Sequence, residues 1–310
     1  MPELRLISVI IPCYNQGRFL AEAIDSAIGQ SYANIEVIVV DDGSTDDTAD
    51  VADRYSQVRH HQVNCVRQTN QGLAAARNRG LEESGGEYVV FLDADDRLAA
   101  GALGVGAESL DSHPDCAFVY GNVRLIDAGG SLLLYPPGVN IKRDHYLELL
   151  RHNHIWSTGA VMYRRSVFAT VGLFDPRVNA SADYDLNLRI AMRHPIFCHA
   201  EVVLEYRKHE SNMTRNLADM LKTSLAVRRS HRKYVKRSRM HKDALEDGIR
   251  AAQKDYGEKL IRAVGSQVRG RQWERARQSS LALLRYYPEG LVRKLFHSVS
   301  RLSFRGDYQR

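Results

Sequence analysis

Apolar runs of strand length alternate with helix-like spacing over the first hundred residues. Strands are expected at residues 8–12, 35–40, 64–68 and 88–92. Between them apolar residues recur every three or four positions, which predicts three helices. The first covers residues 18–30 and the third covers residues 73–84. The second is capped by Ser44 or Thr45 and ends at about Tyr55. Strands separated by helices indicate a parallel sheet with right-handed crossover connections.

The pattern changes beyond residue 115. Two strand-like runs, 117–126 and 131–135, flank Asp127-Ala-Gly-Gly130 and predict an antiparallel hairpin. The next expected elements are a short helix at 144–151, a strand at 159–164, an amphipathic helix at 184–193 and a strand at 202–206 that closes the sheet. The fold class is therefore α/β, with a mixed second half.

After about residue 215 nearly every segment has a helical pattern. The apolar stripe of a long helix consists of Leu245, Ile249, Ala252, Tyr256, Leu260 and Val264. Two further helices are expected at residues 273–287 and 291–302. We therefore predict two domains: an α/β domain over residues 1–214 and an all-helical extension over residues 215–310.

Charge divides along the same boundary. Residues 215–310 carry 24 Lys and Arg against 9 Asp and Glu, a formal charge of +15, whereas residues 1–214 carry 19 against 28, or −9. The whole chain is thus +6. A positive extension on an acidic body favours an anionic partner for the extension.

The bulk composition is typical of a soluble chain. No run of about 18 apolar residues is long enough to span a bilayer, and no signal peptide is evident at the N-terminus. The four cysteines, Cys13, Cys65, Cys116 and Cys198, form no CxxC pair and are typical of a reducing compartment. We therefore expect a cytoplasmic protein.

Polar residues follow three of the predicted strands. Tyr14-Asn15 ends the first strand, Asp41-Asp42 the second, and Asp93-Ala-Asp95-Asp96 the fourth. Ligands of open parallel sheets bind beyond the carboxyl ends of the strands, so these side chains are expected to converge on one edge.

Asp93 and Asp95 stand at i and i+2 on a tight turn. Two such carboxylates can share one divalent cation that also binds phosphate oxygens and neutralises a departing diphosphate. The alternative is a solvated turn with helix-capping aspartates. Likewise, Asp41-Asp42 either accepts hydrogen bonds from a pyrimidine or a ribose or only caps a loop, and Tyr14 either stacks on a base or is a rim aromatic.

Eight segments together carry a family resemblance. They are SVIIPCYN (8–15), VVDDGSTD (39–46), NQGLAAARN (70–78), EYVVFLDADD (87–96), GAVMYRR (159–165), VGLFD (171–175), ADYDLNLR (182–189) and YRKH (206–209). In order and spacing this series resembles the motifs of family 2 glycosyltransferases over roughly residues 6–214. The resemblance implies a GT-A nucleotide-binding fold and inverting transfer of a sugar from a nucleotide diphosphate, which family habit makes uridine-linked, with thymidine as the alternative.

The resemblance also assigns the donor site. Pro12, Tyr14 and Asp42, with Asp41 beside them, would line the base and ribose pocket. Asp93 and Asp95 would hold the diphosphate through Mn²⁺ or Mg²⁺, with Asp95 the favoured direct ligand.

Other assignments keep an alternative. His209 falls where the family often places a residue near the metal, although a surface histidine without a role is the alternative. Asn70, Arg77 and Asn78 either reach the donor or only pin the third helix to the sheet.

The catalytic base is expected in the segment 182–185. The family pattern there is Glu-Asp followed by x-Asp-Leu, and Asp183 matches the aspartate of the pair, whereas Ala182 replaces the glutamate. Inversion requires a carboxylate that takes the acceptor proton, and we assign that role to Asp183. Asp185 is the second choice and is more typical of a helix N-terminal carboxylate. Arg189 is expected to be a structural ion-pair partner for the carboxylates around residues 183–185.

The strongly basic segment 228–242 contains ten Arg, Lys and His residues. One interpretation is attachment to an anionic membrane surface. A second is a solvated helical bundle that packs on the catalytic domain or on a partner subunit, which could be a second copy. The third is nucleic-acid binding, although no binding module is present. The residues contain no GxxxxGK[ST] loop, GxGxxG fingerprint or zinc-ligand spacing.

These observations favour an inverting, metal-dependent glycosyltransferase for surface polysaccharide synthesis. It would act on a hydroxyl of a glycan or lipid-linked acceptor, at the inner face of the cell membrane. A non-catalytic nucleotide-sugar-binding scaffold is the first alternative. A sugar nucleotidyltransferase is the second, although Gln16-Gly17-Arg18 is a poor triphosphate loop.

Overall fold

The structure is a computed structural model that describes residues 4–138, 141, 144–178 and 180–293. The chain forms two compact units. The first comprises Met1–Leu149 and Asn153–Asn212, and the second comprises Leu150–His152 and Met213–Arg310. The division after Asn212 falls two residues before the boundary predicted from the sequence, and the short segment 150–152 is an addition to the helical unit that the sequence did not predict.

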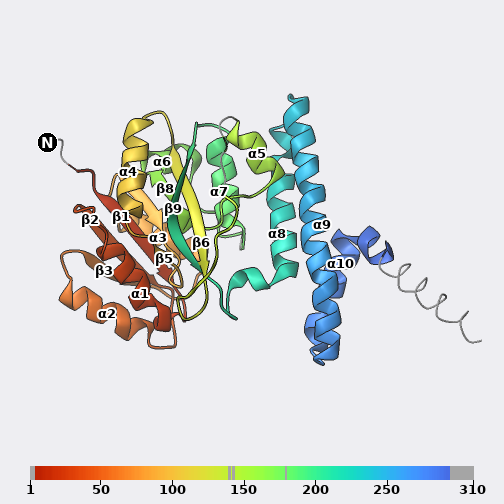
Figure 1. Cartoon of the computed structure of the whole chain (residues 1–310), viewed down its shortest axis with the longest axis horizontal. Coiled ribbons are helices and arrows are strands. Elements are labelled where there is room, and N and C mark those ends of the chain that lie inside the picture. The colour runs from red at the N-terminus through yellow and green to blue at the C-terminus, as the bar shows by residue number, and fades with distance from the viewer. Residues whose placement is uncertain (1–3, 139–140, 142–143, 179, 294–310) are drawn as a thin grey trace, which may run out of the picture. The chain divides into compact units, whose positions relative to one another are not determined.

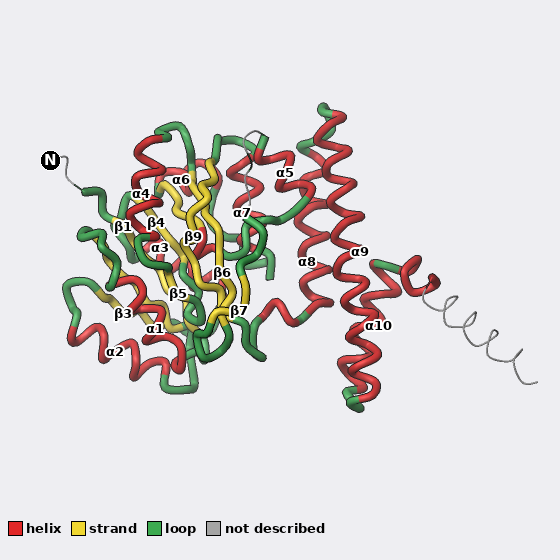
Figure 2. Tube along the Cα trace, viewed as in Figure 1, coloured by secondary structure: helices red, strands yellow, loops and turns green. Residues whose placement is uncertain are grey.

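The first unit is built on one mixed sheet whose strands follow the order β3-β2-β1-β4-β8-β6-β9-β5, with β7 paired to β6 (Figures 1 and 2). The parallel half consists of β1 (Ile7–Cys13), β2 (Ile35–Asp41), β3 (Val63–Arg67) and β4 (Tyr88–Phe91). In register, Ile10 of β1 lies opposite Ile38 of β2 and Phe91 of β4. The four predicted strands are therefore confirmed as a parallel set.

The second half of the sheet is mixed, as predicted. It consists of β5 (Arg97–Leu98), β6 (Phe118–Ile126), β7 (Leu132–Leu134), β8 (Val161–Arg164) and β9 (Phe197–Arg207). β8 is antiparallel to β4 and to β6, whereas β9 is parallel to β6, and β6 and β7 form the expected hairpin. The expectation that residues 202–206 close the sheet is wrong, because the two-residue β5 pairs beyond β9 at the edge.

Helices cover both faces of the parallel strands, with α1 (Gly17–Ile28) and α2 (Thr48–Val58) on one face and α3 (Leu73–Glu82) on the other. Further helices in this part of the chain are α4 (Ala102–Ser112), α5 (His145–Arg151), α6 (Ser166–Val171) and α7 (Ala182–Ala191). Val9 and Ile11 of β1 pack in one core cluster with Leu20 of α1. Ile10 points the other way, where a Cβ at Gly80 of α3 would lie 2.2 Å from its Cγ2. Because both faces are covered, all seven residues of β1 are buried.

The start of α2 differs from the prediction. Ser44 and Thr45 were expected to cap the helix, but α2 begins at Thr48 after the N-cap residue Asp47. The Asp46 carboxylate instead accepts from the backbone N–H of Thr48 at 3.0 Å. Ser44 and Thr45 are engaged with the loop that follows β1, as described below.

The second unit is helical, with α8 (Leu217–Ser230), α9 (Arg239–Arg269) and α10 (Trp273–Tyr286). Four residues of the predicted stripe, Leu245, Ile249, Ala252 and Leu260, are buried, whereas Tyr256 and Val264 are half-buried. The helix expected at residues 291–302 lies largely outside the described residues.

Among the described residues, no helix combines the length and the apolar character needed to cross a bilayer.

Candidate donor and metal site

The loops after β1 and β2 are joined by hydrogen bonds. Asn15 adopts a left-handed backbone conformation with φ of 54°. Its N–H donates to Ser44 Oγ at 3.0 Å, and its Oδ1 accepts from the N–H of Thr45 at 2.7 Å. Asn tolerates the left-handed region better than most residues do, so the residue type suits both the turn and the bond. The carboxyl ends of these two strands therefore form one rigid rim.

The predicted donor aspartates at this rim are both buried. Asp41 Oδ1 accepts from the N–H of Ser44 at 2.9 Å. Asp42 accepts three bonds of 2.8 Å, from Gln68 Nε2 and from the N–H groups of Gln71 and Gly72. These bonds fix the Asp42 carboxylate to the loop 68–72.

The other residues assigned to the base pocket differ in exposure. Tyr14 is 48% exposed and Asn70 is also exposed, so both are accessible to a ligand. Pro12 is buried in β1 opposite Val40. Asn78 is not at the surface of the site, because its amide exchanges two hydrogen bonds with the backbone of Phe174 and so pins α3 to the loop that follows α6.

Asp93, at the start of the DxD turn after β4, is held by a buried cation. Arg77 Nη2 donates to Asp93 Oδ1 at 2.7 Å, and Ser157 Oγ lies 3.4 Å from Asp93 Oδ2. Arg77 is only 4% exposed, and its Nε–H has no hydrogen-bond partner among the described residues. The structure therefore places Arg77 directly behind the DxD turn.

Asp95 contacts a different group. His209 Nε2 lies 2.8 Å from Asp95 Oδ2, and Asn212 Nδ2 lies 3.3 Å from the same oxygen. Ser211 Oγ lies 2.9 Å from His209 Nδ1 and fixes the ring from its other side. The structure thus places His209 in contact with Asp95, and its ring is buried rather than at the surface.

Arg207 and Asp96 complete this turn. Asp96 was expected at this edge from the sequence but was given no role, and Arg207 was not singled out. The fully buried Arg207 donates from Nε to the Asp95 carbonyl at 2.7 Å and from its backbone N–H to Asp96 Oδ1 at 2.9 Å. Its Nη2 also donates to Glu22 Oε2 at 2.7 Å. Burial, with the nearby charges of Asp95 and Asp93, raises the pKa of Asp96 well above its ordinary value. A signal was present in the sequence, since Arg207 stands in the YRKH segment two residues before His209.

Asp183 lies at the start of α7 and is half-buried. Burial raises the pKa of its carboxyl group, the positive charge of Arg77 lowers that pKa, and the negative charge of Asp93 raises it. The predicted base thus interacts electrostatically with Arg77 and Asp93 of the predicted diphosphate site.

Asp185, the second choice for the base, has a structural partner. Arg189 Nε donates to Asp185 Oδ2 at 2.8 Å, as predicted for that arginine. The same guanidinium donates to the carbonyls of Val171 and Leu173. Asp185 therefore anchors α7 to the segment that follows α6.

The oxygen and nitrogen atoms of these side chains suit a divalent cation that also binds phosphate oxygens of a ligand. Carboxylate oxygens and imidazole nitrogens are ligands that Mn²⁺ accepts, and Mg²⁺ and Mn²⁺ in nucleotide sites often take only one or two protein ligands beside phosphate oxygens. The described residues contain no group of three His, Cys, Asp or Glu side chains placed to hold an ion by themselves. Asp95 and His209 thus fit a metal whose remaining ligands come from a diphosphate and water.

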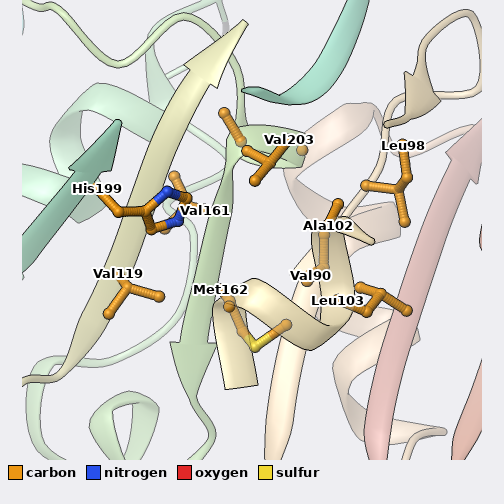
Figure 3. A pocket seen from close by; sticks show the side chains of 12 residues that line it. Val90, Leu98, Ala102, Leu103, Val119, Val161, Met162, His199 and Val203 are labelled. Carbon is orange, nitrogen blue, oxygen red and sulfur yellow. The ribbon is translucent and has the colours of Figure 1, made fainter. Parts of the chain in front are cut away.

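A small interior cavity lies elsewhere in this unit (Figure 3). It measures about 20 Å³, and Val90, Met162, Val203 and the imidazole of His199 are among the side chains around it. This is room for about one water molecule and far below the several hundred Å³ of a substrate pocket. None of its lining residues belongs to the carboxylate cluster.

The fold and the sequence motifs together define a glycosyltransferase. The family model for glycosyl transferase family 2 matches residues 8–172. The chain belongs to glycosyl transferase family 2.

Among curated proteins, this chain is similar to the uncharacterized glycosyltransferase EpsJ of Bacillus subtilis, with 30% identity over 196 residues, 59% of this chain and 55% of EpsJ. It is also 31% identical over 185 residues to a PGL/p-HBAD biosynthesis glycosyltransferase of Mycobacterium bovis, covering 59% of this chain and 69% of that protein. The chain thus spans about half the length of EpsJ.

Two solved structures share the fold. The mannosyltransferase PcManGT from Pyrobaculum calidifontis, in complex with GDP-Man and Mn²⁺, gives a TM-score of 0.60 at 19% identity and covers 91% of this chain and 86% of its own. S. aureus TarS 1–349 in complex with UDP-GlcNAc gives 0.56 at 17% identity and covers 90% of this chain and 91% of its own. The predicted GT-A fold is confirmed.

Proposed function

We propose that this protein is an inverting glycosyltransferase that moves a sugar from a nucleotide diphosphate to a hydroxyl acceptor. The observation that carries the proposal is the division of the carboxylates around one turn. Asp95 and His209 form one pair, Arg77 and Asp93 form another, and Asp183 interacts electrostatically with the second pair. A metal-diphosphate site and a separate base are the two components that such a transfer requires.

Each residue has a distinct task in this proposal. Asp95 and His209 hold Mn²⁺ or Mg²⁺, which when bound neutralises charge on the departing diphosphate. Arg77 orients Asp93 through its 2.7 Å ion pair. Asp183 accepts the proton of the acceptor hydroxyl as its oxygen attacks the anomeric carbon from the face opposite the diphosphate.

The rim of β1 and β2 is proposed as the base and ribose site. Its buried Asp42 carboxylate is already fixed by three hydrogen bonds. The side chain therefore loses little conformational freedom when it binds a pyrimidine N–H or a ribose hydroxyl. Tyr14 is exposed at the same rim and can stack on the base. We assign a uracil donor, with thymine as the alternative; TarS, with UDP-GlcNAc, supports the uridine choice.

A panel of nucleotide sugars tests the donor assignment. With Mn²⁺ present, one or two uridine or thymidine donors are expected to raise the melting temperature and to release nucleotide, whereas guanosine donors are not. Without Mn²⁺ the shift should be largely lost, because phosphate binding relies on the cation. If no donor stabilises the protein under either condition, the scaffold alternative replaces this proposal.

The acceptor is proposed to be a growing glycan or a lipid-linked glycan at the inner face of the cell membrane. The similarity to a relative named for PGL/p-HBAD biosynthesis supports a glycoconjugate pathway. The helical unit supports a membrane location through its exposed cations Arg229, Arg232, Lys233, Lys236, Arg237, Arg239 and Lys242. Tyr234 and Met240 are exposed among them, as expected of an interfacial surface that combines cations with apolar groups.

Vesicle binding tests this location. The protein should bind vesicles of phosphatidylglycerol and phosphatidylcholine, bind phosphatidylcholine alone weakly, and dissociate at high salt. Replacing Lys233, Lys236 and Arg237 by Gln should weaken binding about a hundredfold, since each cation near an anionic surface contributes about 1 kcal/mol.

The matched control replaces three exposed arginines elsewhere in the same unit, Arg262, Arg269 and Arg275, by Gln. It changes the net charge equally and should retain most of the binding. Equal losses in the two triple variants would indicate a general charge effect, and self-association without vesicle binding would favour a homo-oligomer contact.

A further inference from the structure

Trp156 is an exposed aromatic residue beside the candidate site. It is 44% exposed, although both neighbours in the chain, Ile155 and Ser157, are buried. The indole is therefore held at the surface by a backbone that is anchored on either side of it.

The backbone places this ring next to both ends of the DxD turn. Ser157 follows it directly, and Ser157 Oγ lies 3.4 Å from Asp93 Oδ2. Lys208 Nζ lies 5.8 Å from the centre of the Trp156 indole, and Lys208 immediately precedes His209, the partner of Asp95. Two separate chain segments thus connect Trp156 to the carboxylates.

The sheet order places Trp156 away from the nucleotide base. Tyr14 and Asp42 follow β1 and β2, whereas Trp156 precedes β8, which lies on the other side of β4. Neighbouring strands are about 4.8 Å apart, so β8 lies about 10 Å from β1 and about 15 Å from β2. The segment that carries Trp156 thus enters the sheet on the side of β4 away from the β1–β2 rim, to which we assign the base.

The indole is oriented by its neighbours. Tyr206, which is 8% exposed, contacts it edge to face with the ring centres 6.3 Å apart. The Lys208 ammonium lies 4.5 Å from the centre of the Tyr206 ring as well as near the indole. These contacts restrict the indole while leaving much of it open, which is the arrangement of a preformed apolar platform.

We propose that Trp156 is the platform of an acceptor subsite that binds a pyranose ring. A pyranose presents a face of C–H groups that packs on an indole, and its hydroxyl groups remain exposed at the edge of the sugar ring. The acceptor is thus a glycoside rather than a simple alcohol or a peptide hydroxyl. This inference rests on the proposed function and names the acceptor class of the same site.

Fluorescence of Trp156 tests the platform without any donor sugar. The chain contains two tryptophans, and the second, Trp273, is 64% exposed at the start of α10. In the W273F protein, Trp156 is the single emitter. With UDP and Mn²⁺ present, we expect at least one of the methyl glycosides of glucose, galactose, mannose, N-acetylglucosamine and rhamnose to change its emission saturably. Ethylene glycol, an acyclic control that also carries hydroxyl groups, should leave the emission unchanged. The W156F protein, whose emission comes only from Trp273, should show no change with any glycoside.

Kinetics with the glycoside that gives the largest response provide the second test. W156A should raise the KM for that glycoside about tenfold, which corresponds to losing about 1.4 kcal/mol of binding, and should change kcat little. W156F should recover most of the affinity, and W273F should behave as the wild type. Release of nucleotide from the donor in the absence of acceptor should be unchanged in all three variants.

The outcomes separate the two proposals. An emission that no glycoside alters, or an unchanged KM in W156A, overturns the platform while leaving donor binding intact. Failure of every nucleotide sugar to bind would instead overturn the proposed function, and the fluorescence titration would then still report whether Trp156 binds glycosides.

Discussion

Asp183→Asn is expected to lower the rate of sugar transfer by about 10²–10⁴-fold, the range attributed to a general base, while leaving donor affinity nearly unchanged. The amide has the shape of the carboxyl group but cannot accept the acceptor proton at neutral pH. Asp183 is half-buried and interacts with the charges of Arg77 and Asp93, so the neutral amide loses the attraction to Arg77 together with the weaker repulsion by Asp93. Steady-state transfer and metal-dependent thermal shift, measured on the same preparation, separate the two effects.

The pH profile and a second variant provide the controls. Burial raises the pKa of Asp183 above its ordinary 3.8, and only the deprotonated carboxylate is a base. Transfer by the wild type should therefore fall as the pH drops through this raised pKa, and that limb should disappear in Asp183→Asn. Asp185→Asn, which loses the 2.8 Å bond from Arg189, should lower the melting temperature but keep most of the transfer rate per folded molecule. Unchanged transfer in Asp183→Asn would move the role of base to Asp185.

The sequence predicted the parallel strands because their signals are local. β1 and β2 are continuous apolar runs, each followed directly by polar residues, and a strand buried on both faces requires this pattern. The two-residue β5 could not be found in this way, because Arg97 and Leu98 form a strand only by pairing with Glu205 and Leu204 of β9. The start of α2 was also misplaced, since Ser44 and Thr45 bond to Asn15 from a distant turn instead of capping their own helix.

The residues of the candidate site could be predicted where they belong to sequence motifs. Asp93, Asp95, Asp183 and His209 were singled out from the sequence. The structure brings His209 into contact with Asp95, and the charges of Arg77 and Asp93 act on Asp183. Which group bonds to each aspartate was not predictable. Arg77 reaches the Asp93 carboxylate from α3, whereas at the end of β9 the Arg207 guanidinium bonds to the Asp95 carbonyl and the Arg207 backbone N–H bonds to Asp96. Those pairings depend on helix and strand packing between segments up to 112 residues apart. Their roles in catalysis stay predictions.

Asp95→Ala is expected to abolish the stabilisation that a nucleotide gives in the presence of the metal. Asp93→Asn is expected only to weaken it. Asp95 contacts His209, so its loss removes one of the two proposed metal ligands and the partner that orients the other. Asp93 is instead held by Arg77, so its amide disturbs the guanidinium but leaves the Asp95–His209 pair in place.

At a UDP concentration about 100 times its dissociation constant, the wild type should gain about 2.7 kcal/mol, or about 5–10 °C in melting temperature for a unit of this size. Asp95→Ala should gain nothing from adding Mn²⁺ to UDP, and Asp115→Asn, at an exposed position on the same unit, should match the wild type. Melting without ligand shows whether Asp95→Ala is folded, and the milder Asp95→Asn replaces it if it is not. If the alanine variant still responded to Mn²⁺ as the wild type does, the cation would have to be held elsewhere, and the division of the turn into a metal half and a base half would be wrong.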